Sequence, residues 1–138
     1  MGIQWLKMIE NDVFEVRFIS SKKGRGLFAT RLIEKGEVID KAHVIIISRK
    51  ETDKLYHTKI FKYLFEWKFP KSKSDRYYDA IALGPCELIN HDGVDPNARF
   101  YCLKKEKLIV FDALRDIFPG EEITIKYRDD ADKMWFEK

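Results

Sequence analysis

The chain has 138 residues, of which 45% are hydrophobic and 36% charged, and its 26 basic and 23 acidic residues give a formal net charge of +3. This composition excludes an intrinsically disordered chain, and the near balance of charge argues against a dedicated nucleic-acid binder. No run approaches the roughly 20 apolar residues that cross a membrane, so we expect one soluble, intracellular domain over residues 1–138.

The first third of the chain is expected to form strands joined by turns. Residues 14–19 alternate apolar and polar side chains, as a half-buried strand does. A loop at 20–26 should lead to a second strand that begins at Leu27. Two further strands are expected at 38–39 and 44–47, and the continuous apolar run of the second predicts burial on both faces.

The pattern changes at residue 48. Ser48 and Glu51 have the spacing of a helix start, so 48–67 should begin with a short helix. Its second half is rich in aromatic residues, and a strand is the alternative there. A loop is expected at 68–75. The segment 48–75 is too small to hold a core of its own, so we interpret it as an insertion packed on the sheet.

The last part of the chain again favours strands. Residues 80–84 form a small apolar segment, and 98–102 and 108–113 read as two strands around a charged turn. After a turn at Pro119 and Gly120, apolar side chains alternate along a last strand that ends in Tyr127. Many short strands with little helix predict a mostly-β fold.

The cysteines and histidines show no metal-binding pattern. Cys86 and Cys102 lack a Cys-x-x-Cys spacing, which predicts neither a zinc site nor a disulfide framework. His43, His57 and His91 are equally far from a ligand spacing, so no metal site is expected.

Three short motifs are less ordinary. Residues 23–29 read Lys-Gly-Arg-Gly-Leu-Phe-Ala, and the two glycines allow close approach of the backbone to a ligand. Asn90 and His91 lead to Asp-Pro-Asn at 95–97, and 120–127 read Gly-Glu-Glu-Ile-Thr-Ile-Lys-Tyr. Taken alone, each has a plain structural alternative: a hairpin turn, a structural histidine and a core tyrosine.

Together, in this order, the motifs resemble those of SET-domain protein-lysine methyltransferases, especially the small stand-alone viral and bacterial members. The resemblance implies a SET-domain β-fold of several short sheets, with a pseudoknot-like C-terminal crossing and a small, partly helical insertion. It implies transfer of a methyl group from S-adenosylmethionine to the ε-amine of a lysine in a partner protein, such as a histone or another basic protein. It requires no metal and no nucleic acid.

The resemblance also assigns roles. Tyr127 is the expected catalytic tyrosine, which orients the amine. The expected cofactor site comprises Lys23, Gly24, Arg25, Gly26, Asn90 and His91, covered by Trp135 and Phe136 of a tail at 128–138. The expected walls of the lysine channel are Tyr77, Tyr78 and Phe100. Since the reaction is an in-line displacement by a neutral amine, alignment is the main task of these residues.

The sequence departs from the family in two places. Asp92 replaces the usual serine, and the loop before Pro96 is one residue longer. No cysteine follows Cys102, so the zinc cluster that closes many eukaryotic sites is missing. Glu121 and Glu122 are interpreted as turn and strand-edge residues rather than as a catalytic pair, because neighbours on a strand face opposite sides.

Two alternatives stay open beside the enzyme. One is a catalytically silent SET-like module that binds proteins, which the changed loop after His91 leaves tenable. The other is a basic β-domain that binds nucleic acid through its lysines and aromatic residues. The sequence does not decide whether the chain forms a homodimer.

Overall fold

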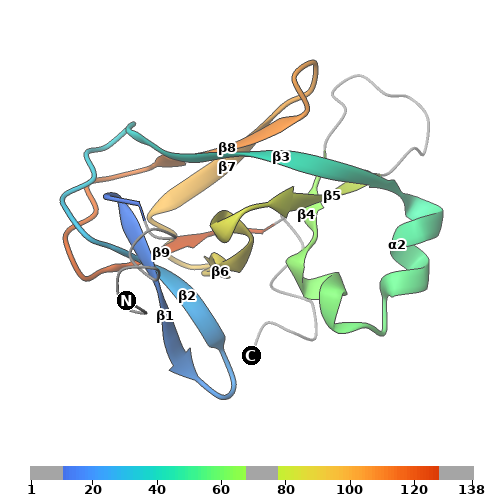
Figure 1. Cartoon of the computed structure of the whole chain (residues 1–138), viewed down its shortest axis with the longest axis horizontal. Coiled ribbons are helices and arrows are strands. Elements are labelled where there is room, and N and C mark those ends of the chain that lie inside the picture. Colours follow the sequence, from blue (N-terminus) through green and yellow to red (C-terminus); the bar gives the residue numbers. More distant parts are fainter. Residues whose placement is uncertain (1–10, 68–77, 128–138) are drawn as a thin grey trace, which may run out of the picture.

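The computed structural model describes residues 11–67 and 78–127, which form two curled sheets (Figure 1). The strand orders are β1-β2-β9-β6 and β4-β5-β3-β8-β7. The strands are β1 (Phe14–Ser20), β2 (Gly24–Ala29), β3 (Val38–Ser48), β4 (Phe65–Glu66), β5 (Tyr78–Leu83), β6 (Asn90–His91), β7 (Ala98–Leu103), β8 (Leu108–Ala113) and β9 (Glu122–Ile125). The helices are α2 (Arg49–Leu55) and the 3-10 turns η1 (Lys59–Tyr63) and η2 (Pro85–Leu88). The mostly-β prediction is confirmed.

The N-terminal hairpin is present, but the predicted alternation of burial holds only for its first part, since Phe14 is 2% exposed and Phe18 is 72% exposed. β1 and β2 are antiparallel, with Val16 opposite Leu27 and Phe18 opposite Arg25. β2 begins at Gly24 rather than at Leu27, because the pairing continues to Ser20 opposite Gly24 through a register shift. Gly24 closes this turn with a φ of +72°, a conformation that suits glycine.

β3 is one strand of 11 residues, where the sequence predicted two. Its first part pairs with β8 and its second part with β5, so the chain stays extended through the polar residues in the middle. The expected burial of 44–47 on both faces is wrong. Ile47 packs with Phe61 and Leu64, but that cover stops short of Ile45, which is 50% exposed on the same face.

The helix predicted after residue 48 is present as α2. Ser48 Oγ accepts a hydrogen bond from the Glu51 N–H at 3.3 Å, and the Glu51 carboxylate accepts from the Ser48 N–H at 2.8 Å, which makes a capping box. Thr52 joins α2 to the sheet by donating to buried Asp79 of β5 at 3.0 Å. The aromatic half contains both η1 and β4, and the loop predicted at 68–75 lies outside the described residues.

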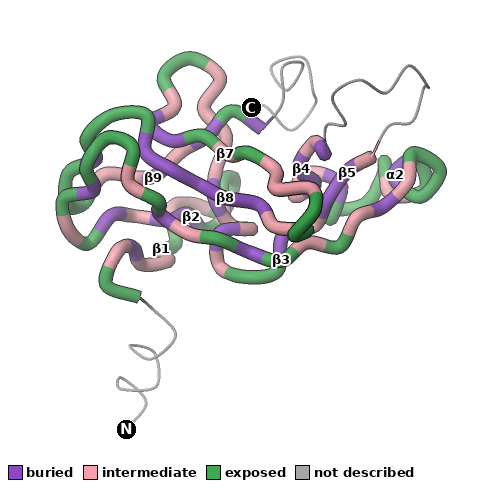
Figure 2. The backbone as a smooth tube through the Cα atoms, turned by 90° about the horizontal axis from the view of Figure 1, so that it is seen from above, coloured by how far each residue is buried: buried purple, intermediate pink, exposed green. Residues whose placement is uncertain are grey.

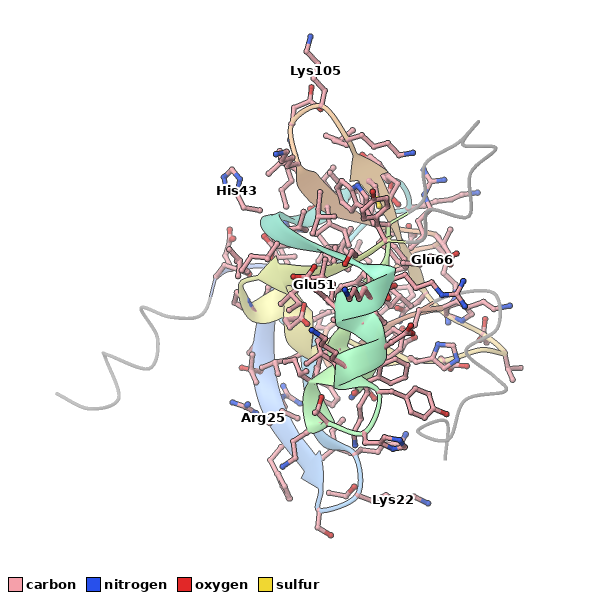
Figure 3. The ribbon with its side chains drawn as sticks, turned by 90° about the vertical axis from the view of Figure 1, so that its right-hand side faces the viewer. Lys22, Arg25, His43, Glu51, Glu66 and Lys105 are labelled. Carbon is pink, nitrogen blue, oxygen red and sulfur yellow. The ribbon has the colours of Figure 1, made fainter. Side chains whose placement is uncertain are left out.

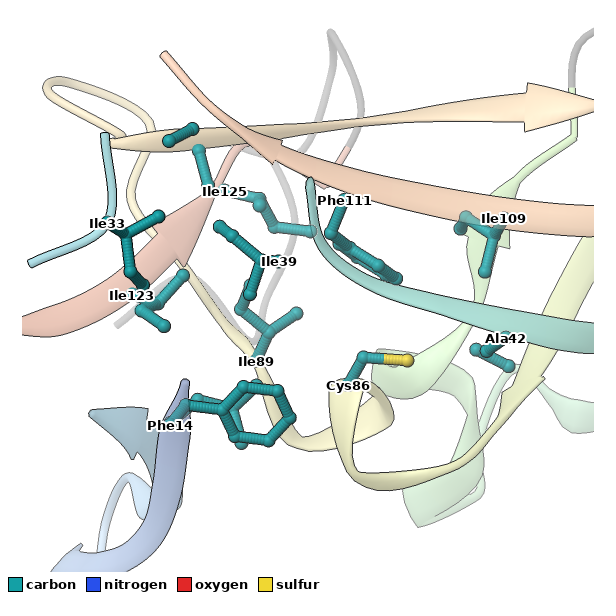
Figure 4. Packing of buried hydrophobic residues seen from close by; sticks show 14 of the residues in the cluster. Phe14, Ile33, Ile39, Ala42, Cys86, Ile89, Ile109, Phe111, Ile123 and Ile125 are labelled. Carbon is teal, nitrogen blue, oxygen red and sulfur yellow. The ribbon is translucent and has the colours of Figure 1, made fainter. Parts of the chain in front are cut away.

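The main core lies between the two sheets (Figure 4). Phe14 and Ile123 enter it from the first sheet, and Ile39 and Phe111 from the second. β8 is buried along nearly its whole length (Figure 2). Cys86 lies in this core, so its thiol is a packing group, and both Cys86 and Cys102 are free cysteines.

β9 is the strand on which distant parts of the chain meet. It pairs antiparallel with β2 and parallel with β6, where Asn90 lies opposite Thr124. Further along, the Asn97 side chain donates to the Glu122 carbonyl at 2.8 Å and accepts from the Thr124 N–H at 2.9 Å. The segment 90–97 therefore crosses the last strand, as the resemblance implied.

Candidate active site

Tyr127 lies two residues beyond the end of β9 and continues the inward alternation of that strand. The residue is 8% exposed. Its hydroxyl donates to the Ile89 carbonyl at 2.6 Å, and its backbone N–H donates to Nδ1 of His91 at 3.0 Å. The structure thus joins the tyrosine of the third motif to the histidine of the second.

His91 has a defined role in this pair. Its ring centroid lies 5.2 Å from that of Tyr127. Because Nδ1 accepts the Tyr127 N–H, Nδ1 carries no proton, and in the neutral ring the proton is on Nε2. His91 therefore fixes the backbone from which the Tyr127 side chain projects.

Asn90 joins all three motifs. Its side-chain nitrogen donates to the Arg25 carbonyl at 3.1 Å and to Oε2 of Glu122 at 2.8 Å. The glycine-containing segment 23–26, the Asn-His pair and the start of β9 thus meet at one amide group. The contact of Glu122 could not be predicted from the sequence, because its partner Asn90 is 32 residues away.

Gly26 is required by this junction. A Cβ atom at this position would lie 2.7 Å from Oε2 of Glu122 and 2.8 Å from Nδ2 of Asn90. Real Cβ atoms do not approach other atoms so closely. The side chains that would have to move, Asn90 and Glu122, are hydrogen-bonded to each other. We expected both glycines to let a ligand approach; Gly26 also makes room for two side chains of the protein itself.

Asp92, the residue that departs from the family pattern, organises the lengthened loop. Its carboxylate accepts from the backbone N–H groups of Val94 at 2.9 Å and Asp95 at 3.0 Å. These two bonds lower its pKa, and the nearby charge of Lys23 acts in the same direction. The backbone N–H of Asp92 donates to the Ile125 carbonyl at 2.8 Å. The extra residue is thus accommodated in a capped turn.

An aromatic group lies beside Tyr127, and the sequence did not predict its central member as a site residue. Phe65 of β4 is 2% exposed, and its ring centroid lies 5.3 Å from Phe100, 5.6 Å from Phe111 and 6.1 Å from Tyr127. Phe100 is therefore joined to the tyrosine through Phe65. This contact depends on a strand of two residues, which has no recognisable sequence pattern.

The family model of the SET domain matches residues 24–128, from the start of β2 to just past Tyr127. The chain belongs to the SET-domain family. A Schizosaccharomyces pombe protein named histone-lysine N-methyltransferase, H3 lysine-37 specific, is 29% identical over 119 residues, which are 86% of this chain and 74% of that protein. The N-lysine methyltransferase KMT5A-A of Danio rerio is 30% identical over 126 residues, and only 36% of its length is covered.

Solved SET structures have the same fold. The Neurospora SET domain protein DIM-5, a histone lysine methyltransferase, superposes with a TM-score of 0.64 at 21% identity, covering 95% of this chain and 58% of that one. CpSET8 from Cryptosporidium gives a TM-score of 0.63 at 26% identity, covering 84% and 57%. The expected SET-domain β-fold is confirmed, and the named relatives support protein-lysine methylation.

The structure describes some of the other expected site residues of this SET domain and not others. Lys23 is exposed, and its N–H donates to Ser20 Oγ at 3.0 Å. Tyr78 opens β5, and its carbonyl accepts from the Trp67 N–H at 3.0 Å. The expected roles of these two stay predictions. Three further expected site residues lie outside the described residues: Tyr77, Trp135 and Phe136.

Two partly buried acids, Asp40 and Glu87, lie near Cys86 in the segment that leads to the Asn-His motif of the SET domain. Burial raises the pKa of Glu87 to about 8, although its Oε2 accepts from the Ala82 N–H at 2.9 Å. Burial also raises the pKa of Asp40 and of the Cys86 thiol, and Asp40 adds to the effect on the thiol. Cys86 is therefore protonated at neutral pH and unsuited to act as a nucleophile.

Three further observations concern the residues that the structure describes. Within 11–67 and 78–127 no group of three or more His, Cys, Asp or Glu residues could hold a metal ion. Glu121 and Glu122 have different partners, because Glu121 accepts from the Phe118 N–H at 3.3 Å and lies 3.5 Å from Arg115, while Glu122 binds Asn90. In the described segments no helix has the length and apolar character to span a bilayer.

Proposed function

We propose that this SET domain transfers a methyl group from S-adenosylmethionine to the ε-amine of a lysine in a protein substrate. The observation that carries the proposal is the meeting of the three motifs at two side chains. Asn90 links segment 23–26 to β9, and His91 links the same motif to Tyr127. A histone lysine is the substrate class that the name of the Schizosaccharomyces pombe relative suggests.

The polar atoms around segment 23–26 fit a cationic cofactor. The Arg25 carbonyl and the Glu122 carboxylate are hydrogen-bond acceptors, and each accepts a hydrogen bond from the Asn90 side chain. S-adenosylmethionine supplies an electrophilic methyl group on a sulfonium and carries an ammonium group. Segment 23–26, Asn90 and His91 would hold it, and a site rich in acceptors favours that positive charge.

Tyr127 would orient the substrate amine. Its hydroxyl hydrogen is directed to the Ile89 carbonyl, so the hydroxyl oxygen retains lone pairs that can accept from an amine N–H. Because this bond and the bond to His91 fix both ends of the residue, the oxygen is held in one place. Such fixed alignment is the main contribution that a displacement of this kind needs from the protein.

Phe65 and Phe100 would form part of the wall of the lysine channel. Their rings are in edge contact, and Phe65 also contacts Tyr127. An apolar wall disfavours the ammonium form of the lysine and so lowers its pKa, which raises the fraction of the nucleophilic neutral amine.

The test is calorimetric titration of the full chain with S-adenosylhomocysteine, followed by a methyl-transfer assay on histones. We expect saturable one-to-one binding and transfer. Absence of binding by a folded sample would contradict the cofactor assignment. Binding without transfer to any protein would favour the silent module. The near balance of 26 basic and 23 acidic residues does not support the nucleic-acid alternative, and the two labelled lysines Lys22 and Lys105 lie at opposite ends of the described part of the chain (Figure 3).

A further inference from the structure

The bonding of Asn90 determines which way round its amide group lies. The Arg25 carbonyl oxygen and the Glu122 carboxylate oxygen are both acceptors, so only the amide nitrogen can face them. The nitrogen has two hydrogens, and these two bonds use both. The side-chain oxygen of Asn90 is therefore turned away from Arg25 and Glu122, and it can only accept a hydrogen bond.

Glu122 is well placed to enforce this orientation. Its backbone lies opposite Phe28 in the pairing of β2 with β9, and its carbonyl accepts from the Asn97 side chain at 2.8 Å. The backbone of Glu122 is therefore fixed by its pairing with β2 and by the hydrogen bond from Asn97. A carboxylate has no donor, so it cannot accommodate the reversed amide.

Gly26 restrains the same pair from the other side. The space that a Cβ atom would take is filled by the Glu122 carboxylate, the Asn90 nitrogen and the Ile19 side chain, each within 2.7–2.8 Å of the Cβ position. The bonded pair consequently has little room to shift toward β2.

We propose that Glu122 is a positioning residue, which fixes Asn90 so that it offers an oxygen, and not an NH₂ group, to the cofactor. This inference rests on the proposed function. An amide oxygen held in this way accepts from an ammonium group and has no donor for a carboxylate. The part of the cofactor that it recognises is therefore the α-ammonium of the amino-acid portion.

The experiment compares two ligands that differ at that group: S-adenosylhomocysteine and its analogue with hydrogen in place of the α-amino group. Each is titrated calorimetrically into the wild-type chain and into Glu122→Ala. The wild type should prefer the amine-bearing ligand by about tenfold or more, as expected of a hydrogen bond to a charged group. In Glu122→Ala this preference should fall to roughly twofold, while the affinity for the analogue changes little, since a freed amide can present either end.

Two further variants serve as a control and as a second test. Glu121→Ala is the matched control, because this neighbouring carboxylate bonds to Phe118 and Arg115 instead, and it should keep the wild-type preference. Gly26→Ala displaces the Asn90–Glu122 pair without removing either side chain, and it should also lose the preference. It serves as the second test if Glu122→Ala does not fold.

The outcomes separate the two proposals. A wild type that binds neither ligand would overturn the proposed function and this inference together. A wild type that binds both ligands equally would overturn the inference alone. An equal loss of affinity for both ligands in Glu122→Ala would also overturn the inference, because it would mean that Glu122 only supports the fold.

Discussion

The hydroxyl of Tyr127 donates a 2.6 Å hydrogen bond to the carbonyl oxygen of Ile89, the residue directly before the Asn-His pair. The end of β9 is thereby tied to the segment between η2 and β6. Since the Tyr127 N–H is bonded to His91 as well, the tyrosine and the motif beside it form one unit. A change at either residue should affect the position of the other.

Tyr127→Phe tests the role of the hydroxyl. We expect methyl transfer to fall by about 100-fold or more, because the ring keeps its contacts but the group that orients the amine is lost. The free energy of unfolding should fall by about 1–3 kcal/mol, since the buried Ile89 carbonyl loses its partner. Affinity for S-adenosylhomocysteine, measured by calorimetry, should stay near the wild-type value.

The control for this variant is Tyr101→Phe, which removes a hydroxyl from a partly exposed tyrosine on β7. It should leave transfer unchanged. An unaltered rate in Tyr127→Phe would contradict the orienting role.

Phe65→Leu tests the aromatic group beside Tyr127. Loss of part of a buried ring should lower the free energy of unfolding by about 1–3 kcal/mol. The KM for a peptide substrate should rise, because Phe65 lies between Phe100 and Tyr127, while cofactor affinity should change little. Steady-state kinetics and urea unfolding measure both effects. Phe118→Leu, at an exposed phenylalanine, is the control, and a KM equal to that of the wild type in Phe65→Leu would place Phe65 outside the channel.

Glu87 should make stability depend on pH. Burial raises its pKa to about 8 in the folded state, whereas the carboxyl of the unfolded chain has a value of about 4.3. As pH rises from 4 to 8 the unfolded chain releases a proton that the folded chain retains, so the free energy of unfolding falls, and above about pH 8 it levels off. Glu87→Gln should lack this component and gain on the order of 2 kcal/mol relative to the wild type at pH 8.

Urea unfolding of both chains at pH 5 and pH 8 measures the difference. Asp40 is titratable and partly buried in the same region, so only the difference between wild type and Glu87→Gln isolates the Glu87 carboxyl. Parallel pH profiles for the two chains would show that this carboxyl is not the source.

Asp92 should stabilise the lengthened loop through its two backbone amides. Asp92→Ala should lower the free energy of unfolding at pH 7 by about 1 kcal/mol, and Asp92→Asn by less, because the asparagine oxygen can still accept. The bonds to Asp95 and Val94 lower the pKa of Asp92, so its contribution is present above the unfolded value of about 3.9 and is lost as pH falls through the lower folded value. Thermal melts from pH 7 down to pH 2 should show Asp92→Asn converging on the wild type; a constant gap would contradict this.

Local patterns in the sequence predicted local structure well. The alternation at 14–19 and the Ser48–Glu51 spacing each depend on residues close together, and both elements are present. β3 was divided in the prediction because Asp40 and Lys41 interrupt its apolar pattern. The structure keeps it continuous, since Asp40 and Lys41 pair with Phe111 and Val110 of β8, and the pairing with β5 begins at His43.

The site was predicted less completely, for a related reason. Motifs predicted Tyr127, Asn90 and His91 as site residues, and the structure brings these three close together. They could not identify Glu122 as the partner of Asn90, or Phe65 as the neighbour of Tyr127. Those contacts arise only when segments more than 30 residues apart are packed, and the residue types involved are common in strands and cores.

The position of β9 has a consequence for the synthesis of the protein. β9 covers one edge of β2 and one edge of β6, and those strands begin almost a hundred and about thirty residues earlier in the chain. Until residues 122–125 have left the ribosome, the backbone groups of β2 that will pair with them have no strand partner on that side. A nascent or truncated chain that ends before Glu122 thus presents an open edge to other chains and invites aggregation.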